Sequence, residues 1–192
     1  MRGQAHTLEG VIAALLVVSS VVFALQMATV TPLTASTANQ HIENQERAAA
    51  AGLLAVAAQE HALRPSILYW NADERRFHGV GTIGYYDTHP PGTRFGELLN
   101  ESFEGVAYNV NFYYHLPSGE RRVRRFVYSG NPSDDAVAVT RKVTLYDGDF
   151  LRDASGGKSP RTLDEAPFFA PDAYPGGHLY NVVEVEVVVW QM

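Results

Sequence analysis

The residues with the most obvious capacity for chemistry are seven histidines and a short acidic run, and neither predicts a site. The histidines are scattered, and no pair has HExxH or another close ligand spacing. Asp147, Asp149 and Asp153 resemble a sparse calcium loop. The twelfth position counted from Asp147 is Lys158, whose charge has the wrong sign for the carboxylate needed there. We therefore predict no metal site and no cofactor.

Catalytic motifs are equally absent from the sequence. The chain has no cysteine, which excludes a structural disulfide, a thiolate zinc site and a cysteine nucleophile. No nucleophile elbow or Ser/His/Asp set is present. Residues 79–84 spell GxGxxG, but two tyrosines and a Pro-Pro turn follow where a dinucleotide-binding loop requires a helix. The sequence predicts a protein that is not an enzyme.

Four arginines gather at 121–125, on a segment with strand-like character. Alternation places Arg121 and Arg125 on one face, and Arg122 and Arg124 on the other. Such a run can bind an acidic glycan, a surface or a neighbouring subunit. The alternative, which we favour, is pairing with acidic residues across an exposed sheet edge, where charge also prevents aggregation.

Asn100-Glu101-Ser102 is an acceptor sequence for N-glycosylation, so Asn100 is a candidate modification site. The similar tripeptide at Asn131 is excluded by Pro132. Glycosylation at Asn100 would require this residue to be exposed outside the cell.

The net charge limits which classes of partner we expect the chain to bind. The chain of 192 residues carries 21 acidic and 15 basic side chains, a net charge of −6. This balance argues against nucleic acid as a partner, because nucleic-acid binders present a basic patch or stripe. The length allows one domain plus an anchor helix.

Residues 8–30 form an almost uninterrupted apolar stretch whose only ionisable side chain is Glu9. A helix of that length spans about 34 Å, enough for a bilayer core of about 30 Å. We therefore predict a transmembrane or filament-core helix at 8–30, anchored in the cell membrane as a single pass. Arg2 places the N-terminus inside and the rest of the chain outside the cell. The alternative is a cleaved signal peptide ending near residues 36–38.

The start of the chain resembles a type IV pilin: a short leader at 1–7 with Arg2 and Gly3, then small polar residues, Glu9 and an apolar helix. The resemblance to archaeal members implies a leader peptidase as a partner. Cleavage between Gly3 and Gln4 would make Glu9 the sixth mature residue, and cleavage between Gln4 and Ala5 would make it the fifth. Both positions remain open.

The same resemblance implies an assembly role for Glu9, paired with the N-terminal amine of a neighbouring subunit. A carboxylate in the first turn of a helix is also favoured by the helix dipole. The simpler alternative is an ordinary helix start with Thr7 as the N-cap.

We predict a helical stalk at residues 31–65. Pro32 should interrupt the helix, and Pro65 should end it. We expect an apolar stripe on the second half of this stalk to pack against a sheet. Its members are Ile42, Ala49, Leu53, Val56 and Ala57, with Glu46 among the residues of the solvent-facing side.

We predict an extracellular β-rich domain at residues 66–192. Apolar residues alternate along four segments, 106–116, 121–128, 136–146 and 179–190. The last segment is uninterrupted, which suggests a central or well-covered place in an antiparallel sheet. Residues 155–177 should form a long irregular loop. The predicted fold class is α+β, with a long N-terminal helix packed on an antiparallel sheet as in pilins.

The whole chain looks like an uncharacterised haloarchaeal family of pilin-like membrane proteins, on its first nine residues and on Val143–Asp147. The first hypothesis is a pilin-like subunit, major or minor, of an archaeal type IV pilus-related filament or secretion machine. Its partners would be membrane lipid and other subunits. The second is a stand-alone single-pass surface domain that binds a ligand or partner, and the third, an extracellular enzyme, is the weakest.

Overall fold

The computed structural model describes the backbone of residues 2–87 and 89–191, and the side chains of 9–25, 40–87 and 89–191. The chain divides into two units, residues 1–42 and 43–192. Helix α1 runs from Arg2 to Gln59 and contributes to both. It is helical through position 32, so the helix does not end there, and the predicted kink stays a prediction; the side chain of Pro32 lies outside the described residues.

The transmembrane part of the predicted fold is also wrong. Within the described residues, no helix is both long and apolar enough to cross a membrane. The apolar side chains described at this end belong to residues 9–25.

Helix α1 ends because His61 adopts a left-handed conformation, with φ of 54°. The amide of Ala62 then donates to the carbonyl of Ala57 (2.8 Å), and that of His61 to Ala58 (3.2 Å), which is the Schellman pattern of a helix end. Helix α2, Leu63–Ile67, follows at once. Pro65 therefore sits in the first turn of a new helix, where its missing N–H costs nothing, and does not end the stalk as predicted.

The second half of α1 buries only part of the predicted stripe: Leu53 and Ala57 are buried, whereas Ala49 is exposed. Ile42 and Val56 are 40% and 39% exposed, and Glu46 is buried. The buried positions follow the helical spacing i, i+4, i+7, i+8, i+11. They are Glu46, Ala50, Leu53, Leu54 and Ala57.

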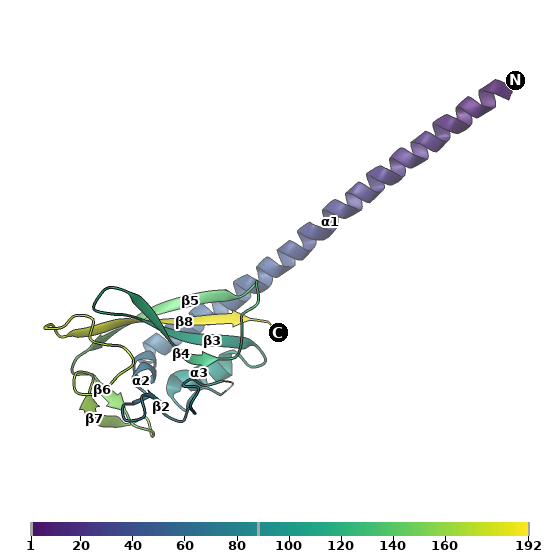
Figure 1. Cartoon of the computed structure of the whole chain (residues 1–192). Coiled ribbons are helices and arrows are strands. Elements are labelled where there is room, and N and C mark those ends of the chain that lie inside the picture. Colours follow the sequence, from purple (N-terminus) through teal and green to yellow (C-terminus); the bar gives the residue numbers. More distant parts are fainter. Residues whose placement is uncertain (1, 88, 192) are drawn as a thin grey trace. The chain divides into compact units, whose positions relative to one another are not determined.

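The four predicted strands form one antiparallel sheet, as expected. They are β3 (Ala107–His115), β4 (Arg121–Tyr128), β5 (Val137–Tyr146) and β8 (Leu179–Trp190). Their order is β4-β3-β8-β5, visible in Figure 1. β8 is therefore one of the two interior strands, in agreement with the predicted central or well-covered place. Alternate residues from Val183 to Val189 point into the core and are at most 1% exposed. The α+β class with an antiparallel sheet is thus confirmed.

Several short elements complete the fold. They are β1 (Trp70–Asn71), β2 (Arg76–Phe77), α3 (Arg94–Ser102), β6 (Phe150–Arg152) and β7 (Lys158–Thr162). β1 pairs with β2 and β6 with β7, so the predicted irregular loop at 155–177 contains a strand. In Figure 1, α2 and α3 lie together on one side of the main sheet.

A buried hydroxyl pair joins α2 to the start of α3. The Thr93 hydroxyl accepts from the amide of Gly96 (3.2 Å) and caps α3. The Ser66 hydroxyl donates to the Thr93 hydroxyl at 2.9 Å, and Ser66 is fully buried. The core also contains an aromatic cluster centred on Phe77, which is 0% exposed. The rings around Phe77 are those of Trp70, Tyr86, Phe112, Phe126 and Phe169.

Candidate functional site

The most exposed apolar surface in the described residues lies on α1 between Val11 and Leu25. Large apolar side chains occupy nearly consecutive positions there, so they face every side of the helix, and each is 48–67% exposed. A helix that is apolar all round is normally enclosed by other apolar groups. We call this the apolar segment; its large side chains are Val11, Ile12, Leu15, Leu16, Val17, Val18, Val21, Val22, Phe23 and Leu25.

The polar groups of the apolar segment are few and suited to close helix packing. The Ser20 hydroxyl donates to the carbonyl of Val17 at 2.8 Å, so it is satisfied within its own helix. A Cβ added at Gly10 would meet no atom within 4 Å, which leaves room for a neighbouring helix. Glu9 is exposed at the start of the segment.

The predicted leader residues Gly3, Gln4 and Ala5 lie within α1, but their side chains are outside the described residues, as is Met1 altogether. The two candidate cleavage positions therefore stay predictions. Glu9 is described, and its predicted assembly role likewise stays a prediction.

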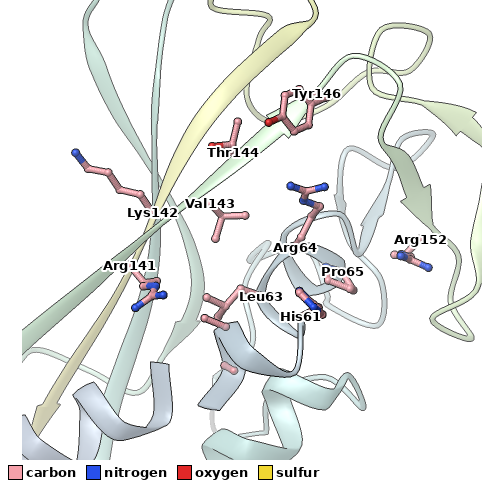
Figure 2. A pocket seen from close by; sticks show the side chains of 12 residues that line it. His61, Leu63, Arg64, Pro65, Arg141, Lys142, Val143, Thr144, Tyr146 and Arg152 are labelled. Carbon is pink, nitrogen blue, oxygen red and sulfur yellow. The ribbon is translucent and has the colours of Figure 1, made fainter. Parts of the chain in front are cut away.

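A second surface feature is a basic groove between the α1–α2 corner and strand β5, with a volume of about 700 Å³. Figure 2 shows Arg64 and Pro65 on the α2 side and Val143 and Tyr146 on β5, whereas Lys142 extends away from α2. β5 is the last strand of its sheet, so one edge of the groove is an open strand edge. We call this feature, lined by His61, Arg64, Arg141, Tyr146 and Arg152 among others, the basic groove.

The charges of the basic groove are only partly balanced. Arg64 pairs with Asp149 at 3.4 Å and lies 5.5 Å from the centroid of the Tyr146 ring. Arg141 and Arg152 have no carboxylate partner within the described residues, and the Nε of Arg152 is buried without a hydrogen-bond acceptor. The groove therefore favours anionic groups. Its arginines were not singled out from the sequence, because they are separated along the chain and only the fold brings them together.

The arginine run at 121–125 lies on β4, which is an edge strand as predicted. Arg121 pairs with Glu184 across the sheet, as in the favoured interpretation. Arg122 pairs instead with Glu120, two residues earlier in the chain, at 2.9 Å. Arg125 lies over the Tyr128 ring at 4.1 Å. Arg124 is the exception, because it is half-buried and has no acidic partner within the described residues.

The carboxylates of the acidic run do not gather around a common centre. Asp149 accepts from the amide of Tyr146 (2.9 Å) in addition to its pairing with Arg64. Asp153 accepts from Ser155 and Gly157, and the Ser155 hydroxyl bond lowers the pKa of Asp153. These carboxylates stabilise turns. Within the described side chains, no cluster of three metal-ligating groups is found.

The remaining motifs lie where the sequence suggested. Asn100 is exposed on α3, so it is accessible to modification. Residues 79–84 form a loop without a following helix, and Gly79 and Gly84 have φ near 78° and 79°. That loop does not have the strand-to-helix context of a phosphate-binding site.

Comparison with known proteins gives a family but no activity. A family model described as a family of unknown function (DUF7288) matches residues 2–189, so the chain belongs to this family. No curated protein and no solved structure gives a significant match.

Proposed function

We propose that this member of the DUF7288 family is a pilin-like structural subunit, major or minor, of an archaeal type IV pilus-related filament or secretion machine, and that it self-associates through the apolar segment. The observation that carries the proposal is the exposure of ten large apolar side chains, each 48–67% exposed, on every side of one helix. Soluble proteins rarely leave so continuous an apolar surface uncovered.

Other copies of the same helix are the occupant that best fits this surface. A single partner helix covers one stripe, whereas a bundle of copies covers all sides. Burying the side chains that are now about half exposed would contribute on the order of 10 kcal/mol per subunit, taking about 1 kcal/mol for each half-buried Val, Leu or Phe. Gly10 and Ala14, one turn apart, would allow close approach of helices at the start of the segment.

Glu9 would set the stagger of the copies. A carboxylate drawn into an apolar bundle needs a positive partner, because an uncompensated buried charge is strongly destabilising. In a pilin-like assembly this partner would be the amine of a neighbouring N-terminus, created by cleavage between Gly3 and Gln4 or between Gln4 and Ala5. Mass spectrometry of the native N-terminus tests this step separately.

Cysteine crosslinking tests the self-association directly, because the natural chain has no cysteine to interfere. In the full-length protein, V17C should form disulfide-linked dimers on mild oxidation, since Val17 lies in the middle of the apolar segment. The matched control is S118C, an exposed position in the turn between β3 and β4 that should remain monomeric.

A polar substitution in the apolar segment provides a second test of self-association. Leu16, 67% exposed in the free chain, should tolerate L16N without loss of fold, yet L16N should reduce crosslinking in a V17C background. Equal crosslinking of V17C and S118C, or a V17C protein that stays monomeric in lipid, would reject assembly by copies. Normal assembly of Glu9→Gln would reject the role of the carboxylate alone.

The basic groove supports a second candidate function, a stand-alone surface domain that binds a ligand or partner. Arg141 and Arg152, which have no carboxylate partner among the residues that the structure describes, favour an acidic partner. A monomeric native protein that retains its original N-terminus would favour this candidate. The cell-surface location is part of both candidates and remains a prediction.

A further inference from the structure

A pocket distinct from both surfaces above lies beside the arginine run. It combines aromatic walls with two arginines that have no acidic partner in the described part of the chain. Its volume is about 430 Å³, within the usual range of about 300–1,000 Å³ for small-molecule sites. We call it the aromatic pocket; the residues used below are Trp70, Arg75, Tyr114, Arg124, Phe168 and Phe169.

The walls are held in place before any ligand arrives. The Trp70 indole N–H donates to the carbonyl of Pro167 at 3.0 Å. The ring centroids of Phe168 and Phe169 are 4.2 Å apart, and Tyr114 lies 5.5 Å from Phe169 at a steep angle. Phe168, Phe169 and Tyr114 are each only partly buried, so ring surface remains open to the pocket. A rigid, half-open aromatic wall suits a ligand with an apolar face.

Arg124 supplies a cation in an unusual setting. Its guanidinium carbon lies 5.0 Å from the Trp70 ring centroid, and its Nη2 donates to the carbonyl of Gly84 at 3.3 Å. The Nε is buried without an acceptor, and no carboxylate partner is found within the described residues. Burial lowers the pKa of Arg124, because desolvation disfavours its charged form. Stacking on Trp70 orients the guanidinium but leaves its charge uncompensated.

Arg75 adds a second cation at the same pocket. It ends the turn between β1 and β2 with φ of 53°, a left-handed conformation that glycine adopts at lower cost. The side chain of Asn71 builds this turn by accepting from the amides of Asp73 and Glu74, at 3.1 Å each. Arg75 is exposed and has no acidic partner within the described residues.

The two guanidinium groups and the aromatic rings together indicate which kind of ligand the pocket would bind. The planar fork of a guanidinium matches a carboxylate, and aromatic rings match the apolar face of a sugar ring. We propose that the aromatic pocket binds a carboxylate-bearing sugar unit of the uronic acid type, with Arg124 and Arg75 on the carboxylate and the rings of Phe168, Phe169 and Tyr114 against the sugar. This proposal is independent of filament assembly, because none of its residues lies in the apolar segment.

Tryptophan fluorescence of the full-length protein provides the test. The chain has two tryptophans, and W190F leaves Trp70 as the sole reporter. In that background, glucuronate should change the emission saturably at millimolar concentration, the weak end of specific affinity. Glucose, which lacks the carboxylate, should bind at least about 10-fold more weakly, the loss expected for one charged hydrogen bond. A glucuronate-bearing oligosaccharide distinguishes the source: tighter binding than the monomer indicates a glycan chain, and equal binding indicates a free sugar acid.

Matched variants assign the site. Arg124→Met keeps the length of the side chain and should weaken glucuronate binding about 10- to 100-fold. Arg75→Gly removes the second cation and relaxes the turn, so it should weaken binding without reducing stability. Arg125→Met is the control, because Arg125 lies over Tyr128 outside the pocket and should bind as the parent does.

Three results would overturn the proposal. They are equal binding of glucose and glucuronate, unchanged binding by Arg124→Met, and no saturable change with either the monomer or the oligosaccharide. Circular dichroism and the unfolding midpoint of Arg124→Met establish that the variant is folded, so that lost binding is not lost structure.

Discussion

Replacing Gly96 with alanine should destabilise the protein, although alanine is the better helix former. Gly96 is the third residue of α3 and is buried. A Cβ built there would lie 2.0 Å from the carbonyl oxygen of Pro91, far inside any normal contact. That oxygen cannot move freely, because it already accepts from the amide of Thr93 at 2.7 Å.

The magnitude follows from three opposing contributions. Alanine gains at most about 1 kcal/mol of helix propensity over glycine. Overpacking against the backbone costs about 1–3 kcal/mol. Displacing Thr93 from its cap costs a further 0.5–2 kcal/mol or so. The sum predicts a net loss of about 2 kcal/mol, which for a unit of this size lowers the unfolding temperature by about 4–8 °C.

Thermal and urea unfolding of the full-length protein, followed by circular dichroism, measures this difference. Gly92→Ala is the matched control in the same loop, because a Cβ at Gly92 meets nothing within 4 Å and that residue is exposed. It should change stability by no more than about 0.5 kcal/mol. If Gly96→Ala were as stable as Gly92→Ala, the close approach of α3 to the preceding loop would be wrong.

Further predictions concern the cap, the buried tyrosines and a surface ion pair. Thr93→Ala should cost about 1–2 kcal/mol in urea unfolding, because it removes the cap and leaves the buried Ser66 hydroxyl without one partner, whereas Thr93→Ser should retain most of the stability. Burial raises the pKa values of Tyr108 and Tyr180 to about 12 each, from an ordinary value near 10, so the unfolded chain ionises first. Stability should therefore be intact below pH 10 and decline between about pH 10 and 12, with a shallower decline in Tyr108→Phe, as tyrosinate absorbance and unfolding together would reveal. Arg94→Gln should leave the unfolding midpoint unchanged, because solvent screens its pair with Glu60; a large drop would contradict this.

The strands were the most predictable part of the fold. Alternating apolar residues located all four strands of the main sheet to within one residue at every end, and the uninterrupted run at 179–190 became one of the two interior strands. The alternation is clearest in β8, where every second residue from Val183 to Val189 is buried and the residues between them are partly exposed. Short strands such as β1 and β6 carry too few residues to show any period, so they were missed.

The stalk was predicted less well, because its boundaries depend on backbone conformations that the sequence does not state. The helix ends at His61 through a left-handed conformation usually reserved for glycine. Alanines on all sides of 48–58 made several stripes equally acceptable, and contact with the core selected the one that contains Leu54 and buries Glu46.

The sequence by itself determined the α+β class, the sheet and the uniform apolar character of the N-terminal helix, since each follows from local periodicity or composition. Only the tertiary structure decided where the candidate binding sites lie. Arg124 lies over the ring of Trp70 and lines the same pocket as Phe169, although these residues are far apart in the sequence. Arg64 likewise lies over the ring of the distant Tyr146. Such sites depend on how distant segments pack, and no local pattern of residues records that packing.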